Sequence, residues 1–194
     1  GIAVTSTGHS HPHVVQAIHD QVAKILLPAS SLGLNRPTLD FLERFGPYLP
    51  EGIDRMWFGN IGAEAVETAV RLARHATGRP NIIAFEGGFH GRTMGAASLT
   101  SSTAKVRAGI SPLMAGVVFA PYPAPARLRS VQGDATDHAL EQLDRILATV
   151  SIPQDTAAFL VEAVQGEGGY VPGTKRFFDG LREHYAEKSD AGLD

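Results

Sequence analysis

The chain has 194 residues, 43% of them apolar and 19% charged, so it can bury a sizeable core in one domain or one and a half. Its formal net charge is −3, and its 17 basic residues are scattered without the cluster that would indicate binding to nucleic acid or an anionic membrane. The absence of cysteine excludes disulfides, thiolate metal sites and a cysteine nucleophile. No apolar stretch approaches the roughly 18 residues of a spanning helix. We therefore expect a cytoplasmic protein whose partners include neither nucleic acid nor membrane.

Two amphipathic helices are predicted near the amino end. Apolar residues recur at helical spacing over 12–27, after Pro12. Pro37 precedes a second such pattern, which ends near Gly46 and Pro47. We expect residues 1–48 to form an amino-terminal segment with two helices and residues 49–194 to form part of a larger α/β domain.

From residue 56 onward, short apolar strands alternate with amphipathic helices. Strands are predicted at 56–59, 82–85, 117–120 and 157–161, and helices at 64–77, 138–149 and 176–187. The proline-rich residues 122–134 are predicted to be a surface connection. Such alternation indicates an α/β fold with a mainly parallel sheet and helices on both faces. Ligands bind such sheets at the carboxyl ends of the strands.

The junction at residues 58–65 predicts an anion-binding turn. An apolar strand is expected to run through two glycines into a helix, whose first N–H groups have no partner within the helix and lie at the positive end of its dipole. Gly62 lets the backbone approach a phosphate, and the small Ala63 keeps the site open. Taken alone, the same pattern also suits plain packing, because glycine-containing turns are common in α/β proteins.

Two further loops are predicted at the carboxyl ends of strands. Residues 86–93 offer an aromatic ring at Phe89, an imidazole at His90 and a guanidinium at Arg92. Residues 162–169 offer two carboxylates, Glu162 and Glu167, among glycines. A phosphate seat, a stacking ring and a receptor for a carboxylate are what a planar phosphorylated cofactor and an amino-acid substrate require.

At these residues the chain resembles the class III (ω-amino acid type) aminotransferases, which are pyridoxal-phosphate enzymes of fold type I. The resemblance runs through residues 8–12, 60–67, 89–93 and 162–169, and the Gln-Gly-Glu-Gly-Gly run at 165–169 is specific. It is nearest to the 4-aminobutyrate and acetylornithine branches. It implies the fold type I large domain, pyridoxal 5'-phosphate as cofactor, an ω-amino acid and a 2-oxo acid as substrates, a ping-pong transfer of the amino group, and a homodimer.

The resemblance also implies roles for particular residues. Cofactor binding falls to Gly62, Ala63, Phe89 and His90, with phosphate on the first two and the pyridine ring against Phe89; substrate binding falls to Arg92, Glu162 and Glu167. Two positions depart from the family pattern, because Ala163 stands where proline is usual and Ile61 where a small polar residue is common. The first departure should loosen the loop that aims the two carboxylates, and the second removes a hydroxyl near the phosphate.

The lysine that transamination requires is not found. A lysine amine must hold the cofactor and move a proton, but the four lysines (Lys24, Lys105, Lys175 and Lys188) lie outside the family pattern. In the family this lysine follows well after the segment matching 165–169. We therefore expect a chain that is incomplete at its carboxyl-terminal side, has no catalytic residue of its own and is inactive alone.

Other interpretations stay open at this point. A non-catalytic module could bind pyridoxal phosphate or another phosphate ligand, and a nucleotide-binding α/β domain could use the turn at 59–62, although the spacing of its glycines does not match a dinucleotide motif. Glu162 and Glu167 could be the acid and base of a glycosidase. His9, His11 and His13 alternate like metal ligands, but no partner follows at ligand spacing, so no metal is expected.

Overall fold

The computed structural model describes residues 4–27, 33–128 and 133–189, and side chains as far as residue 184. Residues 129–132 of the predicted surface connection and the closing residues 190–194 lie outside the described part. The chain divides into two compact units, Gly1–Met56 and Trp57–Asp194. Each unit is described by itself.

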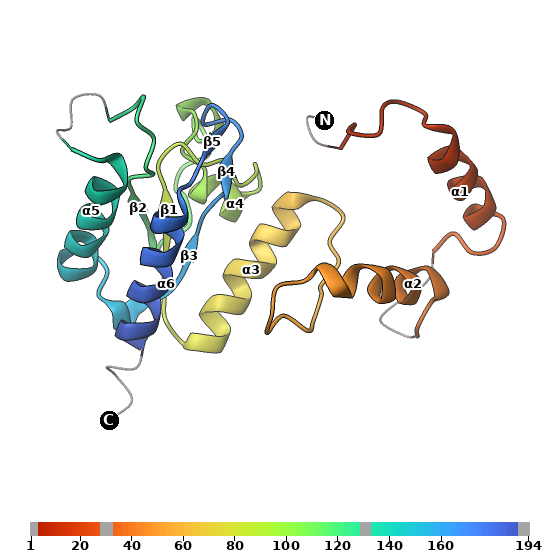
Figure 1. Cartoon of the computed structure of the whole chain (residues 1–194), viewed down its shortest axis with the longest axis horizontal. Helices are drawn as coiled ribbons and strands as arrows, with labels where there is room; N and C mark the ends of the chain where they lie inside the picture. Colours follow the sequence, from red (N-terminus) through yellow and green to blue (C-terminus); the bar gives the residue numbers. More distant parts are fainter. Residues whose placement is uncertain (1–3, 28–32, 129–132, 190–194) are drawn as a thin grey trace. The chain divides into compact units, whose positions relative to one another are not determined.

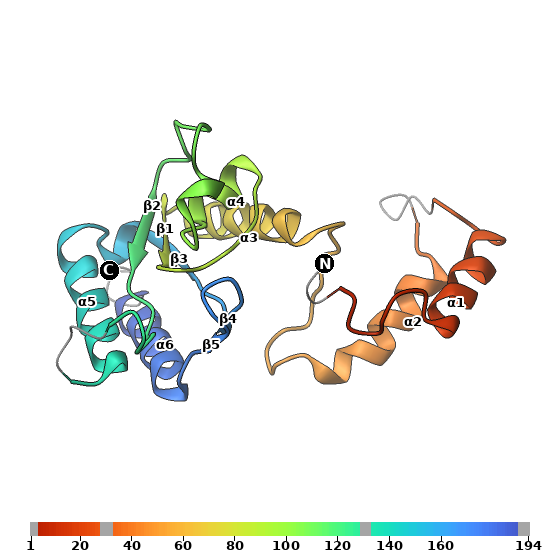
Figure 2. The ribbon, with the colours of Figure 1, turned by 90° about the horizontal axis from the view of Figure 1, so that it is seen from above.

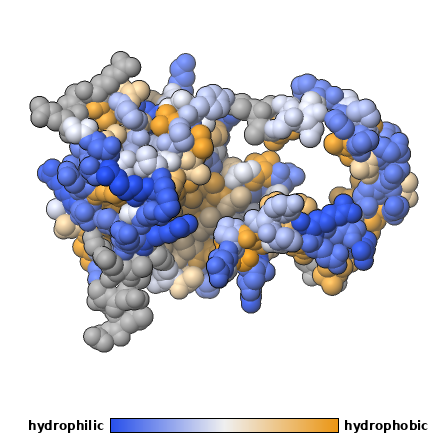
Figure 3. All heavy atoms as spheres, viewed as in Figure 1, coloured by the Kyte–Doolittle hydropathy of each residue, from blue (hydrophilic) through white to orange (hydrophobic). Residues whose placement is uncertain are grey.

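The first unit contains two helices and a short 3₁₀ turn: α1 (Pro12–Val22), α2 (Arg36–Phe45) and Gly46–Tyr48. Helix α1 ends at Val22 and not at the predicted residue 27. Helix α2 begins at a cap, because the Asn35 side chain accepts a hydrogen bond of 2.9 Å from the Thr38 amide. No residue of either helix is buried, and apolar side chains reach the surface of this unit (Figure 3).

The second unit is an α/β domain with a central sheet and a small hairpin (Figure 1). In chain order its elements are α3 (Gly62–Thr77), β1 (Asn81–Phe85), α4 (Met94–Leu99), β2 (Val117–Ala120), α5 (Ala135–Thr149), β3 (Thr156–Leu160), β4 (Val164–Gln165), β5 (Val171–Pro172) and α6 (Lys175–Ser189). Gly78 caps the end of α3 in the left-handed conformation.

The sheet has three parallel strands in the order β2-β1-β3. Ile82 pairs with Val117 on one side and with Ala158 on the other. Because the strands are parallel, their carboxyl ends lie at one edge, where the segments after β1 and β3 begin. The two short strands β4 and β5 form an antiparallel pair just after β3.

Helices cover both faces of the sheet, as Figure 2 shows from above. Ile83 and Phe85 of β1 belong to a core with α5 and α6, whereas Ile82 and Ala84 belong to a second core with α3 and α4. The alternation follows from the period of two in a strand. The predicted fold, a mainly parallel sheet covered on both faces, is confirmed. In the described part of the chain, every helix is too short or too polar to span a bilayer.

Two predictions about local structure are wrong. Residues 56–59 form no strand, because this segment pairs with no strand of the described sheet, and Trp57 and Phe58 are exposed. The connection after β2 is not confined to the surface, since Tyr122 and Ala124 are buried in the core with α5 and α6. Helix α4 was not predicted at all.

Candidate functional site

A pocket of about 520 Å³ lies where the start of α3 meets the segment after β1. Its lining residues come from these two segments alone: Ile61, Gly62, Ala63, Val66, Phe89, His90, Gly91 and Arg92. Five of the seven predicted site residues therefore share one pocket. Its volume lies within the range of about 300–1,000 Å³ that small-ligand sites occupy.

The start of α3 leaves two backbone donors at this pocket. Ile61 is the N-cap residue but offers no side-chain cap, and its carbonyl accepts hydrogen bonds from the amides of Glu64 and Ala65 at 3.1 and 3.3 Å. In the described part of the chain, the amides of Gly62 and Ala63 donate no hydrogen bond. Two free N–H groups at the positive end of a 16-residue helix can donate hydrogen bonds to an anion.

The segment after β1 packs directly against this helix start. A Cβ atom built on Gly91 would lie 2.8 Å from the Cβ of Ala63, so only glycine allows the two backbones to come this close. Thr100 fixes the segment from behind, since its hydroxyl accepts from the His90 amide at 2.9 Å and donates to the Gly91 carbonyl at 3.1 Å. These contacts hold Phe89 and His90 beside the free amides.

His90 lines the pocket and has a buried ring nitrogen without a partner in the described part of the chain. The residue is 9% exposed, and its Nε2 atom is buried and finds no hydrogen-bond partner in the described part of the chain. Burial lowers the pKa of His90, and the nearby Glu162 carboxylate opposes this effect by raising it. The imidazole is therefore neutral near pH 7. The Nε2 atom lies beside Gly88, since a Cβ atom built on that glycine would lie 3.0 Å from it.

Arg92 places a cation at the same pocket. Its guanidinium carbon lies 5.7 Å from the centre of the Phe89 ring, within the range of a cation–π contact. The side chain is exposed, and no described carboxylate forms an ion pair with it. Its planar fork of donors suits a carboxylate of a ligand.

The structure does not bring Glu162 and Glu167 into this pocket. The Oε1 atom of Glu162 accepts from the Phe89 amide at 2.7 Å and its Oε2 atom from the Gly166 amide at 3.0 Å, so both oxygens bind backbone. Glu167 is exposed and accepts a hydrogen bond of 2.9 Å from the Ser102 hydroxyl. The prediction that both carboxylates would line one site with Arg92 does not match this geometry. Glu162 instead ties together the loops after β1 and β3.

The pattern of a known family covers almost the whole chain. The family described as Aminotransferase class-III matches residues 1–191. The chain belongs to the class III aminotransferases. The resemblance predicted at residues 8–12, 60–67, 89–93 and 162–169 is confirmed.

Individual relatives of this class III chain are named aminotransferases. It is 37% identical to 5-aminovalerate aminotransferase DavT of Pseudomonas putida and 38% identical to 4-aminobutyrate aminotransferase GabT of Escherichia coli; each match covers 94% of this chain and 42% of the relative. It is 38% identical to acetylornithine aminotransferase of Archaeoglobus fulgidus, over 95% of this chain and 44% of the relative. The chain thus spans about two-fifths of the length of these relatives.

Solved structures of transaminases share the fold. An amine transaminase from an uncultivated Pseudomonas species, in a PLP-bound form, has a TM-score of 0.79 at 27% identity, covering 94% of this chain and 43% of that one. A taurine:2-oxoglutarate aminotransferase from Bifidobacterium kashiwanohense, in complex with PLP and glutamate, has a TM-score of 0.82 at 27% identity, with coverages of 94% and 42%.

None of the described lysines of this class III chain lines the pocket. Lys175 at the start of α6 forms an ion pair of 2.5 Å with Asp179, and Lys105 lies in a 3₁₀ turn. Lys24 belongs to the first unit, and the side chain of Lys188 lies outside the described part. Among the described residues, the pocket lining therefore offers an aromatic ring, an imidazole and a guanidinium, but no lysine amine.

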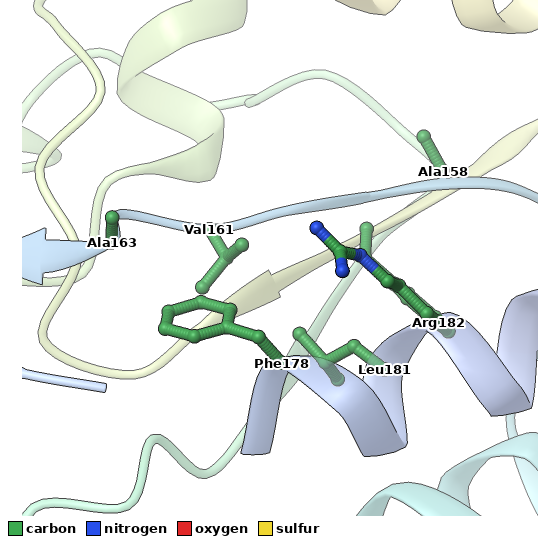
Figure 4. Close-up of a pocket in the computed structure, with 7 residues that line it drawn as sticks. Ala158, Val161, Ala163, Phe178, Leu181 and Arg182 are labelled. Atoms are coloured by element: carbon green, nitrogen blue, oxygen red, sulfur yellow. The ribbon is translucent and has the colours of Figure 1, made fainter. Parts of the chain in front are cut away.

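A larger groove lies elsewhere in the domain. It measures about 620 Å³ and runs between β3 and α6, where Phe178, Leu181 and Arg182 of the helix face Val161 and Ala163 (Figure 4). No predicted site residue lines this groove. Because its walls are mainly apolar and it lacks the convergent polar groups of the first pocket, we assign the functional site to the pocket at α3.

Sequence reasoning missed the residues that join the loops. Gln165 is 1% exposed, and its amide donates to the Glu86 carbonyl at 2.9 Å. Arg127 reaches the same carbonyl from the segment after β2. The hydroxyl of the buried Tyr122 lies 3.3 Å from the carbonyl oxygens of Glu162 and Ala163. The glycines around Gln165 signalled a tight loop, but nothing in the sequence pointed to Arg127.

Proposed function

We propose that this chain forms the phosphate-binding and ring-binding part of a pyridoxal 5'-phosphate-dependent class III aminotransferase. One observation carries the proposal: free helix-start amides, an aromatic ring and an unpaired arginine converge on one pocket. Family membership and the PLP-bound structural neighbours support the same cofactor.

The residues of the pocket suit the cofactor chemically. The amides of Gly62 and Ala63 would bind the phosphate without a charged side chain. Phe89 would lie against the pyridine ring, and His90 would border it. When bound, pyridoxal phosphate supplies the electron sink that loosens bonds at the α-carbon of an amino acid.

The proposed substrates are an ω-amino acid, such as 4-aminobutyrate or acetylornithine, and a 2-oxo acid. Arg92 would bind a substrate carboxylate, because its guanidinium lines the pocket and has no described ion pair. Glu167 would act at the substrate through the loop after β3, where it is exposed. Glu162 would act indirectly, by holding the Phe89 amide. The activities after which the relatives are named support this substrate class.

The isolated chain would bind the cofactor without turning over substrate. No described lysine lines the pocket, so the described part of the chain does not supply the amine that transamination requires. This observation also favours the second candidate, a non-catalytic module for pyridoxal phosphate or a related phosphate ligand. We further propose a cytoplasmic homodimer, which the cysteine-free sequence and the exposed apolar side chains of α1 and α2 support.

One substitution tests the phosphate seat directly. Gly62→Pro deletes one proposed donor, and proline suits this position because Gly62 is the first residue of α3 and the preceding Ile61 is extended. The matched control is Gly62→Ala, which keeps the amide; a Cβ there meets no atom within 4 Å. A hydrogen bond to a charged group contributes about 1.5–3 kcal/mol, so proline should weaken binding roughly tenfold to a hundredfold.

The measurement is a fluorescence titration with pyridoxamine 5'-phosphate, which has no aldehyde to react with surface lysines. Pyridoxamine without phosphate serves as a second ligand and should bind the proline and alanine variants equally. If the unsubstituted chain fails to bind pyridoxamine phosphate, or if proline and alanine bind it alike, the proposed seat is wrong. In a second experiment, pyridoxal phosphate is added and any imine is reduced with borohydride. If the label on a lysine saturates together with binding, at Lys24, Lys105, Lys175 or Lys188, the chain holds the cofactor covalently and the proposed noncovalent binding is wrong.

A further inference from the structure

One arginine outside the pocket joins the loop after β1, which lines the pocket, to the loop after β3. Arg127 lies on the segment after β2, and its Nη1 atom donates to the Glu86 carbonyl at 3.1 Å and to the Gln165 Oε1 atom at 2.9 Å. Its Nη2 atom donates to the Gly168 carbonyl. A single guanidinium therefore bridges the end of β1, the hairpin strand β4 and the glycine-rich turn that follows it.

The acceptors of Arg127 are themselves fixed. Gln165 is 1% exposed, and its Nε2 atom donates to the same Glu86 carbonyl at 2.9 Å. Without Arg127, the buried Oε1 atom of Gln165 would lose the donor that the structure gives it, which is costly for a buried polar group. The exposed arginine thus completes a hydrogen-bond network whose central member is buried.

Two glycines make room for the guanidinium. A Cβ atom at Gly87 or at Gly168 would overlap the Arg127 side chain, and Gly87 has a φ of 81°, which favours glycine. The loops after β1 and β3 therefore each lack a side chain where Arg127 enters between them. The Glu162 carboxylate joins the same two loops on its own, through the amides of Phe89 and Gly166.

We propose that Arg127 is a positioning residue, which holds the Phe89 loop against the glycine-rich loop and so sets the shape of the cofactor pocket. This inference rests on the proposed function, because that function assigns the cofactor to the pocket. Phe89 follows Gly87 by two residues, and its amide is bound by the second loop. Movement of residues 86–88 would therefore shift the proposed stacking ring relative to the Gly62 and Ala63 amides.

The chemistry of the contact explains why the residue is an arginine. All three acceptors are neutral oxygens, and no described carboxylate forms an ion pair with Arg127. Charge pairing is thus not what holds the side chain. A planar guanidinium can donate in several fixed directions at once, whereas a lysine ammonium is a point charge on a flexible stem. Lysine should restore the link only in part.

The test compares Arg127→Ala and Arg127→Lys in the full chain, with Arg145→Ala on the exposed surface of α5 as the matched control. Amide hydrogen exchange should accelerate in both loops, 86–91 and 164–169, in the alanine variant. Affinity for pyridoxamine 5'-phosphate should fall roughly fivefold to tenfold, a size usual for coupled neighbours. Arg127→Lys should lie between alanine and the unsubstituted chain, and Arg145→Ala should match the latter.

A double-mutant cycle keeps the inference falsifiable without any ligand. Gly87→Ala should expel the guanidinium, so it should accelerate exchange at 164–169 in the unsubstituted chain. The positive φ of Gly87 strains alanine in either background, so this acceleration should be smaller, but not absent, in the Arg127→Ala background. Faster exchange confined to 124–128, or additive effects in the cycle, would show that Arg127 does not link the loops after β1 and β3. Normal pyridoxamine phosphate binding by Arg127→Ala would overturn its positioning role. Absence of binding by the unsubstituted chain would contradict the proposed function instead. The exchange results would still test whether Arg127 links the two loops.

Discussion

At the scale of single residues, the site depends on polar atoms whose partners come from backbone. Glu162 shows this most clearly, because each of its oxygens accepts one amide, from Phe89 and from Gly166. Such carboxylate–amide bonds are stronger than neutral ones because the acceptor is charged. The sequence suggested a carboxylate facing substrate, whereas the structure shows one that orders two loops.

The first prediction follows from this role of Glu162. Glu162→Ala leaves two amides without their acceptor and should reduce the free energy of unfolding by about 2 kcal/mol, and Glu162→Gln, which keeps one acceptor but turns an NH₂ group toward the other amide, by about 1 kcal/mol. Urea denaturation measures both. Glu141→Gln, on the exposed surface of α5, is the matched control and should change stability little. Equal stability of all four proteins would show that Glu162 does not hold the loops.

A second prediction concerns His90 and pH. Burial lowers the pKa of His90 below its usual value of 6.5, against the opposing effect of Glu162, so the unfolded chain takes up this proton more readily than the folded one. The stability linked to His90 is therefore complete above about pH 6.5 and is lost as the pH falls toward the lower pKa of the folded state. Urea midpoints between pH 7.5 and pH 5 should fall more steeply for the unsubstituted chain than for His90→Gln. Parallel pH profiles would contradict the buried neutral imidazole, since the other histidines are common to both proteins.

At the scale of elements, long segments with a clear hydrophobic period could be predicted. Elements that depend on contacts with residues distant in sequence could not. Helix α3 was predicted at 64–77 and is observed at Gly62–Thr77, because its apolar stripe and its terminal glycine are local signals. Residues 56–59 have strand-like composition, but a strand forms only with a partner, and the described sheet gives them none. Helix α4 has six residues and no amphipathic stripe. It is capped by Glu67, whose Oε1 atom accepts from the amides of Gly95 and Ala96 at 3.0 and 3.2 Å.

The residues of the candidate site divide in the same way, into those with a local sequence signal and those placed by long-range contacts. The meeting of Gly62 and Phe89 in one pocket could be predicted, because a helix start and a glycine-rich loop are local features with known chemistry. The places of Glu162 and Arg127 could not, because their partners lie 73 and 41 residues away in sequence, at Phe89 and Glu86. Spacing along the chain carries no information about such contacts.

A third prediction belongs to the start of α3. Ile61 has the extended backbone of an N-cap, with φ −143° and ψ 161°, but no side-chain acceptor. Ile61→Ser places a hydroxyl where it can accept a first-turn amide, which should stabilise the chain by about 1 kcal/mol relative to Ile61→Ala. Thermal unfolding of the two variants measures this difference, and both lose the same exposed apolar side chain. Equal melting temperatures would mean that the first-turn amides of α3 are already satisfied.

At the scale of the whole molecule, the second unit presents an unpaired sheet edge beside an apolar groove. In the described sheet β3 pairs only with β1, and its other edge lies next to the groove formed with α6. Unpaired strand edges with apolar neighbours favour association between chains, and a charged side chain at the edge opposes it. Arg182 is exposed at this groove, and Figure 4 shows its guanidinium reaching over the apolar wall toward the strand.

The last prediction tests whether Arg182 limits self-association. Arg182→Leu removes the charge and adds apolar surface to the groove, so association through this edge should begin at roughly tenfold lower concentration, because burying one leucine contributes at least about 1.5 kcal/mol. Arg182→Lys keeps the charge and should behave like the unsubstituted chain. Arg145→Leu, on the exposed surface of α5, makes the same chemical change away from the groove. Sedimentation equilibrium over a concentration series separates the cases: if Arg182→Leu and Arg145→Leu associate equally, added surface hydrophobicity is the cause and the β3 edge is not.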